Sequence, residues 1–410
     1  MTRRQFLMSL AAAGLATPAA SQTLPTADAF DAWVSGAEAV GRLSGISEMT
    51  LASARVGLAL NPALIRPAGA ASESRRVGQY VQRLILGDGP IARGKLAAFP
   101  DIYRIEQRYG VPASVQVAFW GRESGYGRDF GNLDVFSTLA TLGASRSGRT
   151  NWQGEYVAAL TIVDRRLRAR EALKGSSAAA LGHTQLMPSN YLKYGEDFDG
   201  DGRIDVWSPS PLDALASAAR HIQEVAAGQA VPTGGKAWKR GESWIVPVRL
   251  PPGFDINRIE VDETRLTPEA WEAMGIRPAT GDWMAADRPR DAKLALPAGL
   301  GGPALLLFPN YDVFEAYNPS RTYALGVGLL ARAIEGQPGV IWPEEVPLTF
   351  DQRAATQRAL TAQELYSNRI DGDLGASTRK AIRVWQRRNG LAADGYLTLD
   401  LQARITGVTQ

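Results

Sequence analysis

The 410-residue sequence contains 45 Lys and Arg against 42 Asp and Glu, which gives a formal net charge of +3. Hydrophobic residues make up 45% of the chain, enough to bury a full core, so general disorder is excluded. A charge this small does not favour nucleic acid as a partner. The sequence has no cysteine, so we expect neither a disulfide nor a cysteine-linked lipid anchor.

Residues 1–22 have the pattern of an export signal. Arg3 and Arg4 precede an apolar run over residues 6–16, and small residues follow. The run is too short for a membrane span. Because TRRQFLM resembles a twin-arginine leader, we expect export to the periplasm by that route and no transmembrane segment in the mature protein.

The rest of the chain divides into segments that differ in the spacing of apolar residues and in proline and glycine content. Over residues 26 to about 180, apolar residues recur at three- and four-residue spacing, which predicts helices. Residues 236–309 contain short apolar runs broken by Pro and Gly, which predict a few short strands. Residues 336–347 are proline-rich and are typical of a linker. We therefore expect one large domain over residues 26–335 and a compact module over residues 348–410.

The stretch YGVPASVQVAFWGRESGYG predicts a helix that ends at a single carboxylate. Val115, Phe119 and Glu123 are spaced by four, so Glu123 continues an otherwise apolar face. Burial there would raise its pKa, as a general acid working near neutral pH requires. The glycines that follow leave an open backbone that a ligand can approach. A structural glutamate paired with Arg122 or Arg128 is the alternative.

Four separated motifs resemble those of the B-type lytic murein transglycosylases. GRESGYG, ALGHTQLMPSNY, DFDGDGRIDVW and FPNYDVFEAYNPSRTYALGVGLLA occur in the family's order, within a resemblance that covers Ala29 to Glu335. The resemblance implies a mainly α protein, with a lysozyme-like α-rich catalytic core and a small β-containing insertion. It also implies non-hydrolytic cleavage of the MurNAc-GlcNAc β-1,4 bond of peptidoglycan glycan strands, which leaves 1,6-anhydromuramic acid ends, with no cofactor required for the chemistry.

The resemblance gives the catalytic role to Glu123. One glutamate protonates the glycosidic oxygen and then removes the proton from the C6 hydroxyl of the same muramic acid. A second catalytic carboxylate is therefore unnecessary, unlike in the two-carboxylate glycosidases. Hydroxyl, amide and phenol groups suit sugar binding, and the resemblance places such groups at Ser176, Gln185, Tyr317, Asn318 and Tyr323.

Each supporting position has a plainer alternative. Gln185 could cap a helix in TQLMPS, and Ser176 could begin one in GSS. Residues 317–323 could form a turn that only packs on the core. We expect His183 to have a polar surface role, and His221 to lie on the polar side of its helix without a functional role.

The stretch DFDGDGRID has the oxygen-rich front half of an EF-hand calcium loop. Acids occupy positions 1, 3, 5 and 9 and glycine occupies position 6, but position 12 is Ser208 instead of glutamate. The resemblance implies a displaced last acid, here Asp213, although SPSPL makes the separation longer than expected. We expect a structural calcium, with a solvated Asp-Gly turn as the alternative. The expected ligands are Asp197, Asp199, Asp201, Arg203, Asp205 and Asp213.

The C-terminal stretch resembles the small three-helix peptidoglycan-binding module. Asp-Gly pairs at 371–372 and 394–395 predict turns, Thr378 a helix cap, and Ile382 and Trp385 core positions. We expect an independent unit that tethers the enzyme to its polymer. A bundle that binds nothing is the alternative.

Three functional classes are left: a non-hydrolytic lyase, a hydrolytic muramidase, and a non-catalytic peptidoglycan-binding protein. A hydrolase needs a second acid, and only Asp129 and Asp134 lie near Glu123 in sequence. Neither has a motif context, so the lyase is favoured. Cell-wall synthesis or division proteins are candidate partners.

Overall fold

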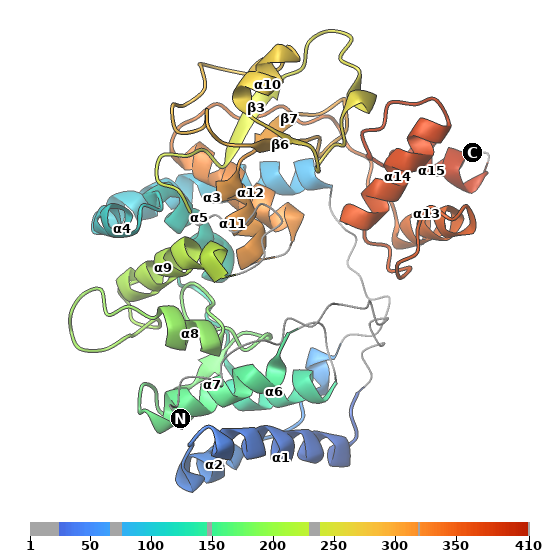
Figure 1. Cartoon of the computed structure of the whole chain (residues 1–410). Helices are drawn as coiled ribbons and strands as arrows, with labels where there is room; N and C mark the ends of the chain where they lie inside the picture. Colours follow the sequence, from blue (N-terminus) through green and yellow to red (C-terminus); the bar gives the residue numbers. More distant parts are fainter. Residues whose placement is uncertain (1–23, 66–75, 146–149, 229–237, 319, 409–410) are drawn as a thin grey trace, which may run out of the picture.

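A computed structural model describes residues 24–65, 76–145, 150–228, 238–318 and 320–408 (Figure 1). The expected leader, residues 1–22, lies outside these ranges. The expected mainly α architecture, with a small β-containing insertion and a C-terminal helical module, is confirmed. Across the described ranges, no helix combines the length and apolarity needed to cross a membrane.

The first helical lobe lies at the bottom of Figure 1 and is built around one buried cluster that includes Phe136 and Tyr156. Asp134 begins a helix of this lobe by accepting a hydrogen bond from the backbone N–H of Ser137 (2.8 Å). The lobe also contains a two-stranded antiparallel sheet, β1 (Leu133–Asp134) with β2 (Lys174–Gly175). Its helices are α1 (Ala27–Leu43), α2 (Glu48–Arg55), α6 (Val135–Ala144), α7 (Trp152–Asp164) and α8 (Pro188–Tyr194). Short 3₁₀ turns of the chain are η1 (Pro62–Leu64), η2 (Arg170–Ala172) and η3 (Ile256–Arg258).

The second helical lobe packs around a larger apolar cluster. One of its helices, α5 (Ala113–Ser124), is buried on almost every side, so its apolar run needs no polar face. The other helices of this lobe surround α5 in Figure 1. They are α3 (Val77–Ala98), α4 (Ile102–Tyr109), α9 (Leu212–Gly228), α11 (Pro309–Tyr317) and α12 (Arg321–Ile334).

The insertion between α9 and α11 is a five-stranded antiparallel sheet in the order β4-β6-β7-β3-β5. The central strand reads ALLL and is buried along its whole length, as expected of a strand covered on both faces. Its own apolar cluster includes Trp271 and Phe308. The elements are β3 (Ile245–Arg249), β4 (Arg265–Leu266), α10 (Pro268–Ala273), β5 (Arg277–Pro278), β6 (Ala292–Ala295) and β7 (Ala304–Leu307).

The C-terminal module consists of α13 (Phe350–Ala362), α14 (Ala376–Arg388) and α15 (Leu399–Thr406). Ile382 and Trp385 lie in its core, as expected. Both Asp-Gly pairs form turns, and Gln357 accepts the backbone N–H of Gly372 (2.8 Å). The expectation that Thr378 caps α14 is wrong: the helix begins after Gly375, and the Thr378 hydroxyl is buried and donates to the Asp373 carbonyl (2.8 Å).

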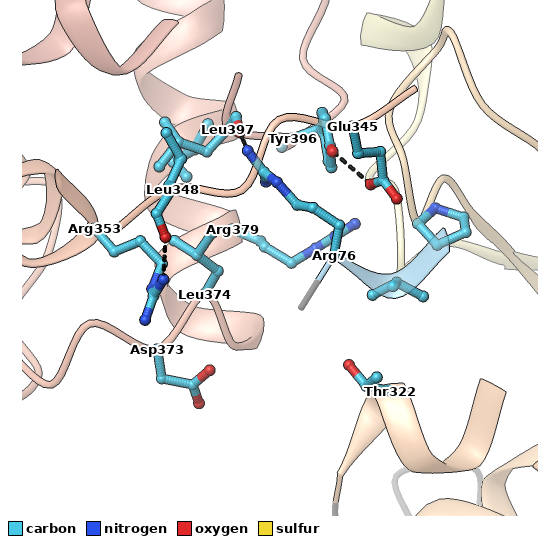
Figure 2. Close-up of a pocket in the computed structure, with 14 residues that line it drawn as sticks. Arg76, Thr322, Glu345, Leu348, Arg353, Asp373, Leu374, Arg379, Tyr396 and Leu397 are labelled. Carbon is cyan, nitrogen blue, oxygen red and sulfur yellow. Dashed lines mark hydrogen bonds between the residues drawn. The ribbon is translucent and has the colours of Figure 1, made fainter. Parts of the chain in front are cut away.

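The segment that joins the two parts has no regular secondary structure, but it packs closely on α3. Trp342 is 7% exposed, and the Glu345 carboxylate accepts from the Gly78 N–H (2.9 Å) and the Tyr396 hydroxyl (2.6 Å). Arg76 donates to the carbonyl of Leu397 (3.0 Å) and lies over the Tyr396 ring (Figure 2). The module is therefore docked on the core, which differs from the expected independent unit.

Candidate active site

The helix α5 delivers Glu123 at its second-last position. Phe119 and Val115, one and two turns earlier on the same face, are fully buried, while Glu123 itself is partly exposed. The helix ends because Gly125, Tyr126 and Gly127 all have left-handed backbones (φ +57°, +63° and +81°). The chain therefore turns sharply away immediately beyond the carboxylate, as the glycine-flanked motif predicted.

A close contact inside this turn explains one glycine of α5. The Tyr126 ring folds back onto the helix, where a Cβ at position 121 would lie only 2.5 Å from it. Gly121 therefore leaves the space that Tyr126 fills. The Tyr126 hydroxyl donates to the Asp88 carbonyl (3.2 Å), which fixes the turn against α3.

The environment of Glu123 adjusts its protonation. Burial raises the pKa of Glu123 to about 7, although the Tyr323 hydrogen bond and the Arg122 charge both act to lower it. The Tyr323 hydroxyl donates to Glu123 Oε1. A carboxyl group with a pKa near neutrality can both give and take a proton at physiological pH.

Tyr317 and Asn318 lie where α11 ends. The Tyr317 ring contacts Phe119 of α5 with ring centroids 4.7 Å apart, and its hydroxyl donates to the Thr184 carbonyl (2.6 Å). Asn318 Oδ1 accepts from the backbone N–H of Ser320 (3.2 Å), just before α12. The α11–α12 junction and the 181–186 loop are thereby held together beside α5.

Gln185 lies in that loop with a left-handed backbone (φ +51°). Its side-chain amide donates to the carbonyls of Phe130 (3.2 Å) and Gly182 (3.0 Å), so it stabilises loops and caps no helix. The Ser124 hydroxyl donates to the His183 carbonyl (2.7 Å), which ties the loop to the end of α5. The structure therefore brings Gln185 close to the Glu123 end of that helix.

Ser176 follows β2 and begins no helix. Its hydroxyl oxygen accepts from the backbone N–H groups of Ala178 (3.4 Å) and Ala180 (3.3 Å). The loop that follows α5 passes so close that a Cβ at Gly131 would lie 2.5 Å from the Ser176 Cα. Ser176 is thus linked to the α5 end through the backbone of Gly131.

Both histidines are buried, which corrects the surface positions expected for them. His183 is 3% exposed; its Nδ1 accepts from Trp120 Nε1 (3.0 Å) and its Nε2 donates to the Ser208 carbonyl (2.7 Å). His221 is 6% exposed and lies between the rings of Tyr194 and Tyr317. Burial lowers the pKa of both, that of His221 to about 4, so both are neutral at pH 7.

The aspartate-rich loop over residues 197–205 meets the start of α9. Carboxylate oxygens of Asp197, Asp199 and Asp213 lie within 4.8 Å of one another. Two oxygens that each bind calcium at about 2.4 Å are at most about 5 Å apart, so this spacing fits the ion. Asp213 is buried and also accepts backbone N–H groups from Phe198 (2.8 Å) and Asp205 (3.0 Å), so the long SPSPL spacing does not prevent it from reaching the loop.

The other expected ligands lie outside this group of three. Asp201 accepts the backbone N–H of Arg203 (2.9 Å). Asp205 accepts the backbone N–H of Trp207 (3.0 Å) and pairs with Arg168 (3.5 Å). Among the residues that the structure describes, the side chains of Asp197, Asp199 and Asp213 are thus the acidic group close enough together to hold a cation.

The two acids nearest to Glu123 in sequence are engaged elsewhere. Asp129 accepts the backbone N–H of Gly131 (2.9 Å), which makes a local turn. Asp134 caps α6 and forms an ion pair with Arg170. Both carboxylates therefore have structural partners of their own.

Comparisons with known proteins agree with this architecture. The profile described as "Transglycosylase SLT domain" matches residues 29–332, and "Putative peptidoglycan binding domain" matches residues 351–405. The chain is 30% identical over 237 residues to Membrane-bound lytic murein transglycosylase B of Escherichia coli (strain K12). That alignment covers 56% of this chain and 59% of the relative, less than two thirds of its length.

Solved structures give longer matches. SltB3 from Pseudomonas aeruginosa in complex with NAG-anhNAM-pentapeptide is 36% identical with a TM-score of 0.80, over 92% of this chain and 99% of that one. The soluble lytic transglycosylase SltB1 from the same organism is 26% identical with a TM-score of 0.60, over 75% and 98%. The chain therefore belongs to the transglycosylase SLT domain family, in the B-type group whose motifs it resembles, and carries a peptidoglycan-binding domain at its C-terminal end.

Proposed function

We propose that this chain is a lytic murein transglycosylase. It cleaves the MurNAc-GlcNAc β-1,4 bond of peptidoglycan and leaves 1,6-anhydromuramic acid ends. The observation that carries the proposal is Glu123, a partly accessible carboxyl group whose burial raises its pKa to about 7 and which receives a hydrogen bond from Tyr323. The family assignment supports the same reaction.

Glu123 acts in two steps. Its protonated form gives a proton to the glycosidic oxygen, and the bond from that oxygen to C1 of MurNAc breaks. The resulting carboxylate takes the proton of the C6 hydroxyl, whose oxygen forms the new bond to C1. The Tyr323 hydroxyl stabilises the carboxylate between the steps, and the carboxyl group is protonated again at the end.

Polar and aromatic groups around Glu123 hold the sugar. The Gln185 amide nitrogen is used by two carbonyls, which leaves its oxygen to accept from a sugar hydroxyl. The Ser176 oxygen accepts from the backbone, so its hydroxyl hydrogen is available to a ligand. Tyr317, Asn318 and Tyr323 lie at the junction of α11 and α12, and the aromatic rings of the two tyrosines suit pyranose rings.

Two other functions are less well supported. A hydrolytic muramidase needs a second carboxylate or a positioned water, and Asp129 and Asp134 are both used in local structure. A non-catalytic binding protein would have no use for a partly accessible glutamate with a pKa near neutrality. The positions of these three acids therefore favour the lyase.

Product analysis tests the proposal directly. Digestion of purified sacculi in isotopically labelled water should give muropeptides that end in anhydro sugars, lighter by one water than reducing-end products and free of label. Mass spectrometry reads both properties. Labelled reducing ends would establish hydrolysis, and intact sacculi would establish a binding protein.

A structural calcium ion is proposed at Asp197, Asp199 and Asp213, because their oxygens are close enough to share one cation. It would fix the 197–205 loop against α9, away from the chemistry. Ligand at 100 times its Kd stabilises a native state by about 2.7 kcal/mol, which we expect as a rise of several degrees in melting temperature. Asp199→Asn should remove that rise, whereas Asp101→Asn, at an exposed site, should keep it. Equal curves for the parent with calcium and with chelator would contradict the site.

The proposed location is the periplasm. Acting on peptidoglycan requires a compartment that contains it, and the export pattern of residues 1–22 supports the twin-arginine route. Cell-wall synthesis or division proteins as partners stay a prediction.

A further inference from the structure

One buried carboxylate joins the core, the insertion and the C-terminal module. Asp262 lies in the insertion, and its Oδ1 accepts from Nη2 of Arg321, the first residue of α12 (2.6 Å). Its Oδ2 accepts from Nη2 of Arg379 on α14 (3.1 Å) and lies 3.5 Å from Nη1 of Arg383. We call these four residues the Asp262 cluster. Each part of the chain contributes a charge to it.

Hydrogen bonds to backbone carbonyls hold two members of the Asp262 cluster in place. Asp262 has a left-handed backbone (φ +70°), and its N–H donates to the Leu294 carbonyl of β6 (2.8 Å). Arg379 also donates to the Leu296 carbonyl (3.3 Å). Burial alone would raise the pKa of Asp262, but the guanidinium groups hold it below its usual range, so the carboxylate stays charged.

The start of α12 connects this cluster to Glu123. Arg321 and Tyr323 both lie in the first turn of the helix, which Ser320 caps by accepting the Tyr323 N–H (3.3 Å). Between them, Thr322 lines a pocket that Arg379 also lines (Figure 2). A shift at Arg321 therefore moves the turn that presents the Tyr323 hydroxyl to Glu123.

We propose that Asp262 and Arg379 are positioning residues for the reaction, through which the docked C-terminal module fixes the start of α12 and so the Tyr323 hydroxyl on Glu123. The proposal rests on the proposed role of Glu123. It gives the module a part in catalysis in addition to binding polymer. Simple docking of two domains, without effect on the acid, is the alternative that a test must separate.

The sign of the effect follows from the groups that face Glu123. Tyr323 of α12 and Arg122 of α5 lower the pKa of Glu123, while burial raises it. Tyr317 of α11 and Tyr80 of α3 also lie close enough to interact with its charge, and both are neutral at pH 7. Loss of the Tyr323 bond therefore raises the pKa of Glu123, because a hydrogen bond to a carboxylate favours its charged form.

The test uses full-length Asp262→Asn and Arg379→Gln with a short soluble MurNAc-GlcNAc oligosaccharide. Asparagine tolerates the left-handed backbone and removes only the charge. We expect kcat to fall about tenfold, the scale of a charge-assisted hydrogen bond, with KM little changed. On the alkaline side of the pH profile, where activity falls as pH rises, the apparent pKa should increase by about half a pH unit or more. Lys380→Gln, on the same helix in an exposed pair with Glu263, is the matched control and should behave as the parent.

Further variants separate positioning from folding. Arg379→Lys keeps a charge for Asp262 and should recover part of kcat. In a Tyr323→Phe background, Arg379→Gln should cause little further change in the pKa of Glu123, read by NMR of the labelled carboxyl group, because the link is already cut. If Asp262→Asn fails to fold, the measurements on Arg379→Gln alone test the proposal. A folded Arg379→Gln protein with parental kcat and pH profile overturns the proposal, even if it melts earlier. The two proposals fail in different experiments. Activity in Glu123→Gln would refute the role of Glu123 as the acid, whereas the NMR titration would still show whether Arg379 affects the pKa of Glu123.

Discussion

Glu123→Gln should fold as the parent does and lose nearly all turnover of purified sacculi. The amide oxygen can still accept from Tyr323, so the local geometry survives, but an amide can neither give nor take the proton. Because the same group serves both steps, we expect a loss of about 10,000-fold or more, at the top of the range for general acid-base catalysis. Soluble anhydromuropeptides released per enzyme are the measurement.

Asp129→Asn is the matched control for this variant. Within the described ranges, its side-chain oxygen accepts the Gly131 N–H, which the asparagine oxygen can also accept, so most activity should be kept. Loss in the control with retention in Glu123→Gln would reverse the assignment of the acid. More than about a tenth of parental activity in Glu123→Gln would exclude Glu123 as the group that transfers the proton.

A melting experiment on the same variant separates loss of the acid from loss of the fold. The folded pKa of Glu123, raised by burial to about 7, exceeds the usual value near 4.3 in an unfolded chain. The native state therefore holds the proton more tightly, and ionisation of Glu123 lowers the free energy of unfolding as pH rises from about 4 to 7. Glutamine avoids that cost, so at pH 8 the variant should have a higher melting temperature than the parent, with a free energy of unfolding greater by up to about 3 kcal/mol. At pH 4 the difference should be smaller.

Local patterns predicted the parts of the site that lie within one element. The four-residue spacing of Val115, Phe119 and Glu123 holds in α5, and the glycines after Glu123 do end the helix with left-handed backbones. Alternating short apolar runs marked the insertion for the same reason, because the periodicity of a strand is local. The fold class can be predicted largely from the local spacing of apolar residues that marks helices and strands.

Contacts between distant elements were not predictable from these patterns. Tyr323 lies 200 residues from the carboxylate that it contacts, and Asp262 is one acid in an irregular loop whose partners are 59 and 117 residues away. His183 carries a polar side chain in a loop, which suggests exposure. Only the folded structure shows Trp120 and Ser208 satisfying both of its ring nitrogens.

Deletion of residues 348–410 should impair turnover of short soluble substrates as well as of sacculi. The sequence alone predicted a loss confined to polymer, because a proline-rich linker suggests an independent tether. In the structure the deletion would remove Arg379 and Arg383 from Asp262, and the Tyr396 hydroxyl from Glu345. Buried groups that lose their partners are costly, so we also expect a melting temperature lower by several degrees.

A flexible Gly-Ser insertion after Gly339 is the control that separates docking from mere connection. Gly339 is exposed and precedes the packed Trp342, and lengthening a surface loop costs little free energy. The insertion keeps every contact of the docked module and should keep activity on both substrates. If the truncated protein turned over soluble substrate at the parental rate and lost only binding to sacculi, the module would be an independent tether after all. If the truncated protein loses turnover of the soluble substrate and the insertion variant keeps it, contact with the docked module, and not the length of the connection, holds the start of α12 in place beside Glu123.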